Sequence, residues 1–457
     1  MTVAIVLYTS DLRVHDHPPL RAALSSAEEV VPLFVRDSRI EAAGFGAPNR
    51  QAFLADCLAD LDAGLRARGG RLIVRSGNPV AAVAAVAEES DADEVHMAAG
   101  ASGYARAREA GLREVLEREG RRLYVHDGVV TAVAPGELTP AGSDHFAVFT
   151  PYFRRWAALP PRALSAAPRH VPVPEGIATE ALPARDAVRG VSGLLARGGE
   201  SEGRELLTRW LSGGIRQYAQ THDDLAADAT SRLSPHLHFG TVSATEIVRG
   251  AQQRGGLGAA AFVRQICWRD FHYQVLAARP GAAAADYRSR HDHWRTEQDA
   301  GEEIQAWRDG RTGYPLIDAA MRQLRQEGWM HNRARLLTAS FLTKTLYVDW
   351  RIGARHFLDL LVDGDIANNQ LNWQWAAGTG TDTRPNRVLN PLLQARRFDP
   401  DGAYVQRWVP ELAGLAVPYV HQPWKLSGAD RAAIDYPEPL VDLTDALGRF
   451  RRSRGIG

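Results

Sequence analysis

The segment DGDIANNQLNWQWAAGTGTDTRPN, residues 363–386, says most about the fold and use of the second half of the chain. It crowds acidic, amide and tryptophan side chains together and then enters a loop rich in Gly and Thr. Asn and Asp are poor helix-interior residues, because their side chains compete for backbone hydrogen bonds. If the segment is helical, Asp365, Asn369 and Trp373 share one face. Such a face suits a flat, polar, aromatic ligand better than a plain core.

Composition limits the classes of protein to consider. The chain has 457 residues and a formal net charge of zero. This length predicts two or three domains, and any nucleic-acid site must be a local basic patch. The two cysteines, Cys57 and Cys267, stand in unrelated contexts, so we expect no disulfide framework and a reducing cytoplasm. The N-terminus does not resemble a signal peptide and no apolar run approaches membrane-spanning length, so no membrane partner is expected.

Residues 1–130 alternate short β-branched runs with amphipathic stretches, which predicts an α/β domain with a doubly wound parallel sheet. The expected strands are Val3–Tyr8, Val30–Val35, Arg71–Arg75, Glu94–Met97 and Arg122–His126. The expected helices are Pro19–Ser25, Asn49–Gly69, Val80–Glu89 and Tyr104–Glu119. Such sheets bind ligands beyond the carboxyl ends of their strands. The first turn, residues 9–13, lacks the glycine patterns of dinucleotide and P-loop sites, which disfavours both.

The rest of the chain changes character twice. Residues 131–195 are rich in Pro, Ala and Gly without periodicity and are interpreted as an interdomain connector, in which residues 149–156 form a local docking point. Residues 196–457 have helical spacing throughout, which predicts an all-α C-terminal domain. All eleven tryptophans lie beyond residue 150, so the two halves are expected to serve different chemistry.

Two motifs could hold phosphates or bases. Thr230-Ser231-Arg232-Leu233-Ser234-Pro235 places hydroxyls beside an arginine ahead of a helix, which could hold a phosphate; the alternative is an ordinary N-cap. Arg264, Trp268 and His272 share one helical face and could stack a base and neutralise a phosphate. The alternative there is one core tryptophan with solvated arginines.

A third motif lies at residues 329–335. Arg335 could pair with a carboxylate such as Asp363, while Arg333 faces elsewhere, toward phosphates; the alternative is a structural ion pair. No metal site is expected, because His15, His17, His236 and His238 lack metal-ligand spacing.

In this order, the motifs closely resemble the photolyase/cryptochrome flavoprotein family. The resemblance runs from Ser10 to Leu412 and is nearest to class I cyclobutane pyrimidine dimer (CPD) photolyases of actinobacterial type. It is carried by TSRLSPHLHFG, WRDF, TGYPLIDAAMRQL, GWMHNRAR, DGDIANN and WQWAAGTGTD. The family has an N-terminal α/β antenna domain and a helical C-terminal domain that binds FAD and DNA, so the resemblance implies these for residues 1–130 and 196–457.

The resemblance also implies roles for residues of the FAD site. Asp363, Asp365 and Asn369 are implied to line the isoalloxazine, with Arg335 paired to Asp363 and Asn369 facing flavin N5. A neutral amide tolerates a protonated N5, whereas a carboxylate would titrate with it. The whole set implied to bind cofactors is Tyr218, Thr230, Ser231, Arg232, Leu233, Ser234, Gln265, Trp268, Arg269, His272, Asn332, Arg335, Asp363, Asp365 and Asn369, with Arg50 matching relatives that bind a deazaflavin antenna.

The resemblance implies two uses for tryptophan. Trp373, Trp350 and Trp294 match a relay that carries electrons from the surface to the flavin, and Trp268 and Trp375 match the pair that wedges a flipped-out dimer. Trp373 and Trp375 are separated by roughly 200° around a helix, so each can serve a different partner. The implied catalytic set is Trp268, Trp375, Asn369, Gln265, Trp294, Trp350 and Trp373.

The implied activity is light-driven repair of CPDs by electron transfer from excited reduced FAD to the dimer. The implied partner is UV-damaged DNA, duplex or single-stranded, bound by a monomer. Candidate phosphate contacts are Arg333, Arg387, Arg396 and Arg397. The antenna pigment implied is 8-hydroxy-5-deazaflavin, with methenyltetrahydrofolate as the alternative.

Other readings stay open at this point. Gln265 stands where many dimer photolyases have a Glu, and Gln there is similar to (6-4) photolyases and animal cryptochromes. Leu336 replaces a Met common beside the dimer pocket. Asn332 argues against the (6-4) class, which carries a histidine at that position. A cryptochrome-type blue-light sensor using the same flavin is the further alternative, although sensors usually add a regulatory tail.

Overall fold

The computed structural model describes residues 2–456, which form two compact units. The first unit comprises residues 1–191, 196–219 and 231–280, and the second comprises residues 192–195, 220–230 and 281–457. The domain boundaries predicted at residues 130 and 195 were placed where the sequence pattern changes, not by contacts, and they stay a prediction.

The first unit contains the predicted parallel sheet. Its strands are β1 (Val3–Tyr8), β2 (Glu29–Arg36), β3 (Ile73–Ser76), β4 (Glu94–Ala98) and β5 (Arg122–His126). All neighbouring strands pair in parallel, in the order β3-β2-β1-β4-β5. The order reverses between β1 and β4, which confirms the doubly wound topology. Every residue of β1 is buried, as expected for a strand covered on both faces.

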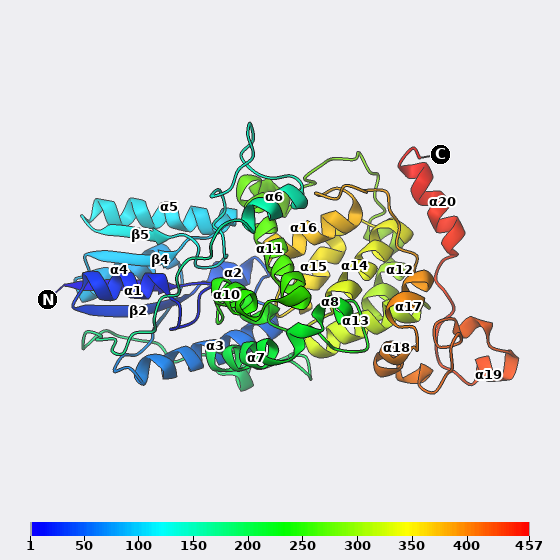
Figure 1. The fold of residues 1–457 in the computed structure, drawn as a ribbon, viewed down its shortest axis with the longest axis horizontal. Helices are drawn as coiled ribbons and strands as arrows, with labels where there is room; N and C mark the ends of the chain where they lie inside the picture. Colours follow the sequence, from blue (N-terminus) through cyan, green and yellow to red (C-terminus); the bar gives the residue numbers. More distant parts are fainter. Residues whose placement is uncertain (1, 457) are drawn as a thin grey trace. The chain divides into compact units, whose positions relative to one another are not determined.

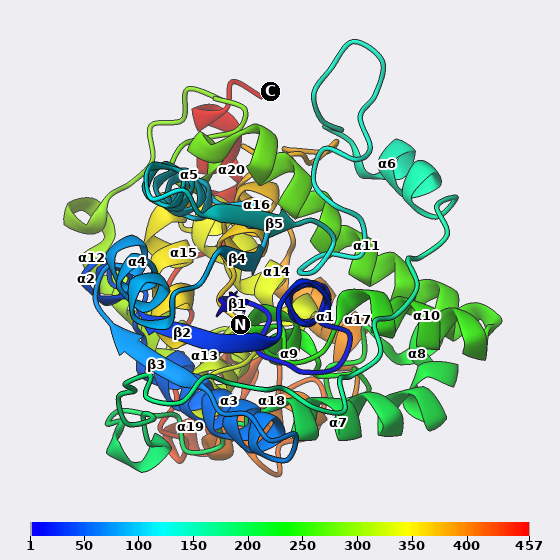
Figure 2. The ribbon, with the colours of Figure 1, turned by 90° about the vertical axis from the view of Figure 1, so that its left-hand side faces the viewer.

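Helices cover both faces of this sheet (Figures 1 and 2). They are α1 (Pro18–Ser26), α3 (Pro48–Arg66), α4 (Pro79–Ser90) and α5 (Gly103–Arg118). Helices α4 and α5 pack together over one face, and α1 lies over the other. Asn78 and Ser102 cap α4 and α5 by accepting hydrogen bonds from their first-turn N–H groups. The five-residue helix α2 (Ser38–Ala42) was not predicted from the sequence.

The first βα turn is closed by a buried arginine. Arg13 is 1% exposed and donates hydrogen bonds to the carbonyls of Asp16, Val129 and Gly240, at 2.8–3.1 Å. The turn is therefore fastened by the protein's own side chain to two distant segments of the same unit. This explains why the turn needs none of the glycines that admit a phosphate.

The remainder of the first unit is a connector followed by helices. These are α6 (Phe149–Trp156), η1 (Arg185–Ala187), α7 (Glu200–Ser212), η2 (Gly214–Arg216), α9 (Ser234–Phe239), α10 (Ala244–Arg254) and α11 (Gly256–Ala278). The short helix α8 (Tyr218–Thr221) and the turn η3 (Pro280–Ala283) stand where the chain passes between units. Helix α6 buries Phe149, Tyr152 and Trp156, so the predicted docking point exists, and α6 packs against α11.

The second unit is helical, as predicted, and its described residues form no strand. Its helices are α12 (Glu297–Asp309), α13 (Pro315–Glu327), α14 (Asn332–Ser340), α15 (Trp350–Leu360), α16 (Ile366–Ala377), α17 (Pro391–Phe398), α18 (Ala403–Trp408), η5 (Pro410–Leu412), η6 (Pro423–Lys425), α19 (Gly428–Ala432) and α20 (Leu443–Ser453). Helix α14 continues into one π-helical turn, η4 (Phe341–Thr345). Trp307 and Trp350 are the largest fully buried side chains of the core. Within residues 2–456, no helix combines the length and apolar character needed to cross a membrane.

Candidate functional site

Helix α16 carries the polar face predicted from the sequence. Asp365 is its N-cap, and the carboxylate accepts a hydrogen bond from the Asn368 N–H at 2.7 Å. Asp365, Asn369 and Trp373 are 8%, 9% and 2% exposed, so the three side chains are buried together along one side. A cap position also explains how an aspartate is tolerated at this helix.

The amide of Asn369 has a fixed orientation. Its Nδ2 donates to the carbonyl of Ala354 at 3.0 Å and to Oε1 of Gln370 at 2.9 Å. Both amide hydrogens are therefore used inside the protein, and a flipped amide would set its oxygen against the Ala354 carbonyl. Oδ1 is the atom that Asn369 can offer to a ligand, and it can only accept a hydrogen bond.

The predicted pairing of Arg335 with Asp363 is confirmed. The guanidinium donates two hydrogen bonds to the carboxylate, at 2.8 and 3.1 Å, and a third to the carbonyl of Met330. The Asp363 side chain is 3% exposed and that of Arg335 is 23% exposed. This bidentate geometry fixes the loop that leads into α16.

Trp373 lies in a dense aromatic cluster. Its ring meets Phe357 edge-on at 4.9 Å and Trp307 at 6.0 Å between centroids. A Cβ on Gly353 would stand 2.2 Å from the indole, so glycine is what lets α15 approach this ring. Trp307 is fully buried and was not assigned to the relay from sequence. Nothing in the local spacing of Trp307 indicates this contact.

The other two relay tryptophans have different surroundings. Trp350 is buried and its Nε1 donates to Asp286 at 2.8 Å. Trp294 is partly buried, packs against Tyr347 at 4.9 Å, and is covered by the guanidinium of Arg454 at 5.7 Å. Nε1 of Trp294 has no hydrogen-bond partner within residues 2–456.

Trp375 leaves α16 on a different side from Trp373. It is half-buried, whereas Trp373 is buried. The guanidinium of Arg387 lies over its ring, 5.5 Å from the centroid. The helix ends at Gly378, which adopts φ +85°, and the chain turns into the loop that carries Arg387. The two indoles thus have separate neighbours, as the helical spacing predicts.

In the first unit, Trp268 is part of a stacked column. Phe149 of α6 lies flat on it, with centroids 3.7 Å apart and an interplanar angle of 3°. Arg264 lies 4.7 Å from the centroids of Phe149 and Phe153. Trp268 and Gln265 are both half-buried on α11. The predicted link between Arg264 and Trp268 therefore passes through Phe149, which sequence analysis did not assign to the site.

Asp270, within the WRDF motif, fastens the connector to α11. Its Oδ2 accepts three hydrogen bonds at 3.0 Å, from the N–H groups of Ala132 and Val133 and from Nε1 of Trp156. Complete burial raises the pKa of this carboxyl to about 6, although the Arg269 charge and the three donors oppose the shift.

The free energy of unfolding should depend on pH through Asp270. The carboxyl has a higher pKa in the folded chain than in the unfolded chain, so between about pH 4 and 6 the folded state binds the extra proton. Its contribution is therefore present below pH 4 and is lost as pH rises to 6, by up to about 3 kcal/mol. Urea unfolding of the wild type and of Asp270→Asn across this range measures it. A constant difference between the two proteins would contradict the assignment.

Several other residues predicted to bind the cofactor make internal contacts. Arg269 donates to the carbonyls of Val130 and Leu237 at 2.8 and 3.1 Å, and lies over the Tyr273 ring. Tyr218 and His272 are buried side chains of the first unit. These residues shape the structure around α11 whether or not they also touch a ligand.

The phosphate motif at residues 230–235 has an unusual backbone. Arg232 adopts φ +50°, a left-handed conformation that is uncommon for a non-glycine residue. Ser231 Oγ accepts a hydrogen bond from the Leu233 N–H at 3.3 Å. Helix α9 starts at Ser234 without a side-chain cap, which removes the ordinary N-cap alternative. The Thr230 hydroxyl is buried and bonds to no other residue in the described part of the chain.

The structure places two predicted contact residues in internal interactions. Arg333 makes three hydrogen bonds to Asp223 at 2.8–3.1 Å and lies 4.6 Å from the Phe398 ring centroid. The ion pair engages this guanidinium, whose side chain is 23% exposed, and a contact of Arg333 with phosphates stays a prediction. Arg50 is 6% exposed and donates to the Phe45 carbonyl at 2.7 and 3.1 Å. By contrast, Asn332 is exposed at the start of α14.

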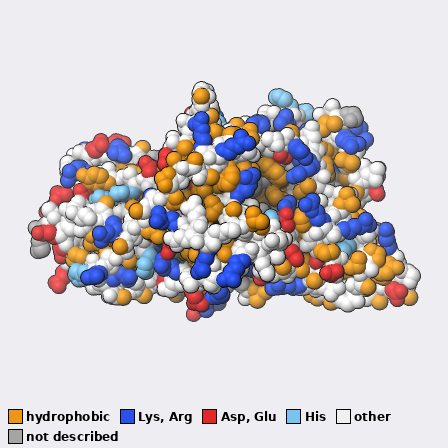
Figure 3. Space-filling model, in the orientation of Figure 1, with side chains coloured by type: hydrophobic (Ala, Val, Ile, Leu, Met, Phe, Trp, Pro, Cys, Tyr) orange, Lys and Arg blue, Asp and Glu red, His pale blue; other side chains and the backbone are white. Residues whose placement is uncertain are grey.

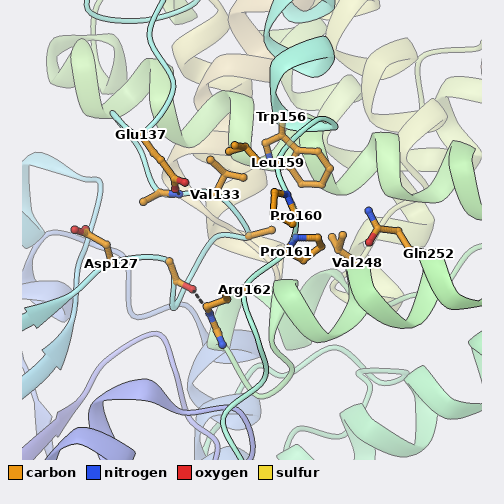
Figure 4. A pocket seen from close by; sticks show the side chains of 13 residues that line it. Asp127, Val133, Glu137, Trp156, Leu159, Pro160, Pro161, Arg162, Val248 and Gln252 are labelled. Carbon is orange, nitrogen blue, oxygen red and sulfur yellow. Dashed lines mark hydrogen bonds between the residues drawn. The ribbon is translucent and has the colours of Figure 1, made fainter.

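A pocket of about 220 Å³ lies in the first unit beside the connector (Figure 4). Its apolar wall comes from the connector and from α10, and consists of Val133, Trp156, Leu159, Pro160, Pro161 and Val248. Arg162 at its edge is paired to both carboxylate oxygens of Asp16, at 2.6 and 2.7 Å. No residue predicted to bind FAD, an antenna or DNA lines this pocket.

Charged side chains of both signs lie on the face of the molecule drawn in Figure 3. On the face drawn in Figure 3, basic and acidic side chains mix with apolar ones, without a single block of one sign. Within residues 2–456, no group of three or more His, Cys, Asp or Glu side chains is arranged to hold a metal ion.

Comparison with known families identifies the fold. Residues 4–175 match the family described as DNA photolyase, and residues 262–453 match the FAD binding domain of DNA photolyase. A deoxyribodipyrimidine photo-lyase of Streptomyces griseus is 66% identical to the chain over 457 residues, which is the full length of both proteins. The chain belongs to the photolyase/cryptochrome family.

Two further relatives are less similar to the chain. A cryptochrome DASH of Natronomonas pharaonis is 35% identical, covering 97% of the chain and 98% of its own length. The crystal structure of a class III photolyase from Agrobacterium tumefaciens has a TM-score of 0.92 and 31% identity, covering 100% of the chain and 97% of its own. The two-part photolyase fold predicted from the sequence is thus confirmed.

Proposed function

We propose that the chain is a deoxyribodipyrimidine photo-lyase, an enzyme that repairs cyclobutane pyrimidine dimers in DNA with light. The observation that carries this proposal is the 66% identity to a protein of that name over the full length of both chains. The aromatic and amide side chains of α11 and α16 have the chemistry that this reaction needs.

We propose that FAD is bound by the residues named above for it. Two features of the structure fit that group. Asn369 presents a fixed acceptor, which suits a ring N–H. The buried Thr230 hydroxyl has no partner in the described part of the chain, and a phosphate oxygen would satisfy it. The ion pair of Arg335 and Asp363 would hold the polypeptide around the ring.

When bound and reduced, FAD supplies the photoexcited electron for ring opening. The residues of the chain would orient the flavin, exclude water from it and recognise the lesion. Asn369 Oδ1 would accept a hydrogen bond without titrating, and Trp373, buried beside Phe357, would be the first relay residue. Trp350 and Trp294 would continue the relay toward the surface.

We propose that Trp268 and Trp375 each contact the lesion, and that Gln265 bonds a base edge. Each indole is half-buried and has a partner that fixes its plane: Phe149 for Trp268 and Arg387 for Trp375. A damaged pair costs less to flip out than an intact pair, which contributes to selectivity. A neutral amide at Gln265 can both donate to and accept from a base.

A light-versus-dark repair assay tests the proposal. Oligonucleotides carrying one CPD or one (6-4) photoproduct are incubated with the FAD-loaded protein, with and without blue light. We expect light-dependent repair of the CPD alone. Repair of the (6-4) lesion alone would establish the other photolyase class, and repair of neither would exclude both enzyme readings.

Replacing Asn369 by Asp should leave FAD bound and change its photoreduction. The new carboxylate oxygen would face the Ala354 carbonyl in place of an N–H group, at a cost of about 1–3 kcal/mol unless it takes up a proton. Absorption spectra recorded during illumination with a reductant measure the flavin states that accumulate. Asn372→Asp, on the same helix but bonded to the Asn368 carbonyl, is the control. Spectra identical to those of the wild type would refute the role of Asn369.

The remaining assignments are also proposals. The antenna would be 8-hydroxy-5-deazaflavin near Arg50, with methenyltetrahydrofolate as the alternative. The protein would be a cytoplasmic monomer that binds damaged DNA, either duplex or single-stranded. Mass spectrometry and fluorescence of the pigment released from the purified protein would identify the antenna.

A cryptochrome-type light sensor is the second candidate function. It is favoured by the 35% identity to a cryptochrome DASH over 97% of the chain. A protein that photoreduces its flavin but repairs neither lesion in the assay above would belong to this class.

A further inference from the structure

Two buried polar side chains hold the loop that follows α16. Ser340, at the end of α14, accepts a hydrogen bond from the Leu389 N–H at 3.2 Å through its Oγ. Lys344, four residues later, donates from Nζ to the Arg387 carbonyl at 2.9 Å. The two side chains are 1% and 2% exposed. Both side chains therefore bind the backbone of one short segment, residues 387–389, from the interior of the second unit.

Lys344 is an unusual residue to find in a core. It lies in the π-helical turn η4, an element often found at functional sites. Burial disfavours its charged form and lowers the pKa of the amine to about 7. The charged groups that act on it are Asp382 and Asp292, which favour the ammonium, and Arg387 and Arg454, which oppose it. An apolar side chain would fill this space at a lower desolvation cost. What the lysine adds is its hydrogen bond to the Arg387 carbonyl, with Nζ also 5.9 Å from the Phe450 ring centroid.

The same segment carries the partner of Trp375. The Arg387 backbone is held by Lys344, and its guanidinium lies 5.5 Å from the Trp375 ring centroid. A cation over an indole is favoured by the ring quadrupole, but a flexible arginine keeps this position only if its backbone is fixed.

We propose that Lys344 is a positioning residue for lesion binding: it fixes the backbone at Arg387 and so keeps the guanidinium over Trp375. Ser340 holds the same segment two residues further along, at the Leu389 N–H. The proposal rests on the proposed function, because it takes Trp375 as a surface that meets the damaged base. Lys344 itself need not touch DNA.

The test uses the FAD-loaded protein and two oligonucleotides, identical except for one thymine dimer, with Kd measured in the dark. For Lys344→Met we expect roughly tenfold weaker binding of the damaged strand, the loss expected for one hydrogen bond to a charged group. Binding of the undamaged strand and FAD content should change less than twofold. Lys425→Met is the matched control, because Lys425 is exposed and is the only other lysine of the chain.

A second measurement, on the wild-type protein, tests the proposal even if Lys344→Met fails to fold. Wild-type protein labelled with carbon-13 at the lysine ε-carbon should give two signals, one per lysine. The Lys344 signal should titrate near pH 7 and shift when the damaged strand is added, but not when the undamaged strand is added. A Lys344 signal indifferent to the lesion, or a folded Lys344→Met with wild-type preference for damage, would overturn the proposal. A wild-type protein with no preference for damage would instead refute the proposed function, and this inference with it.

Discussion

The Asp363→Ala variant is expected to lose most of its FAD and to unfold more easily by about 2–4 kcal/mol. The carboxylate is nearly fully buried and receives two hydrogen bonds from Arg335, so its removal leaves a guanidinium without its partner. Breaking a buried pair costs about 3–5 kcal/mol, and the 23% exposure of Arg335 reduces this. Urea unfolding and flavin absorbance after gel filtration measure the two effects.

The chain offers a matched control for that experiment. Arg355 and Asp359 form an ion pair on α15 at 2.9 Å, with side chains 50% and 46% exposed. Asp359→Ala should cost less than about 0.5 kcal/mol and leave FAD in place. Equal losses of stability in Asp359→Ala and Asp363→Ala would show that burial adds nothing to the Arg335–Asp363 pair. Unchanged FAD content in Asp363→Ala would remove the pair from the cofactor site.

The Trp373→Phe variant is expected to abolish photoreduction of the flavin while repair by chemically reduced enzyme survives. Phenylalanine fills most of the space between Phe357 and Gly353, so stability should fall by only about 1–2 kcal/mol. It is far harder to oxidise than tryptophan and cannot pass on an electron. Flavin absorbance during illumination with an external donor measures the first effect, and repair after dithionite reduction measures the second.

Two further variants make the second experiment specific. Trp210→Phe replaces another buried tryptophan, 6% exposed and in the first unit, and should leave photoreduction intact. Trp307→Phe tests whether the indole of Trp307 contributes to photoreduction, since its ring lies 6.0 Å from that of Trp373. Photoreduction at the wild-type rate in Trp373→Phe would exclude Trp373 as the first relay residue.

The sheet could be predicted to within two residues because its strands are short, β-branched and bounded by polar turns. The Arg335–Asp363 pair was also predictable, since bidentate geometry favours arginine with a carboxylate. The side-chain pattern could not show that Asp365 caps α16, because cap and interior positions share the same periodicity. Nor could it show which atom Asn369 presents, since that depends on a carbonyl fifteen residues away, at Ala354.

Contacts between distant segments account for the other differences. Arg333 pairs with Asp223, a partner 110 residues away that the sequence did not indicate. Phe149 reaches Trp268 from a connector that has no periodicity in sequence. The anchoring of Arg387 by Lys344 joins a buried turn to a loop. In each case the partner is set by tertiary packing, which local spacing does not encode.

The stack of Phe149 on Trp268 has a consequence for the kind of ligand that can bind there. With ring centroids 3.7 Å apart and planes nearly parallel, Phe149 covers one face of the indole. A flat ligand can reach only the opposite face, so Trp268 can cap a base stack but cannot be entered from both sides. Intercalating dyes, which need two open faces, should therefore be poor competitors at this position, whereas a single base that ends a stack should compete well.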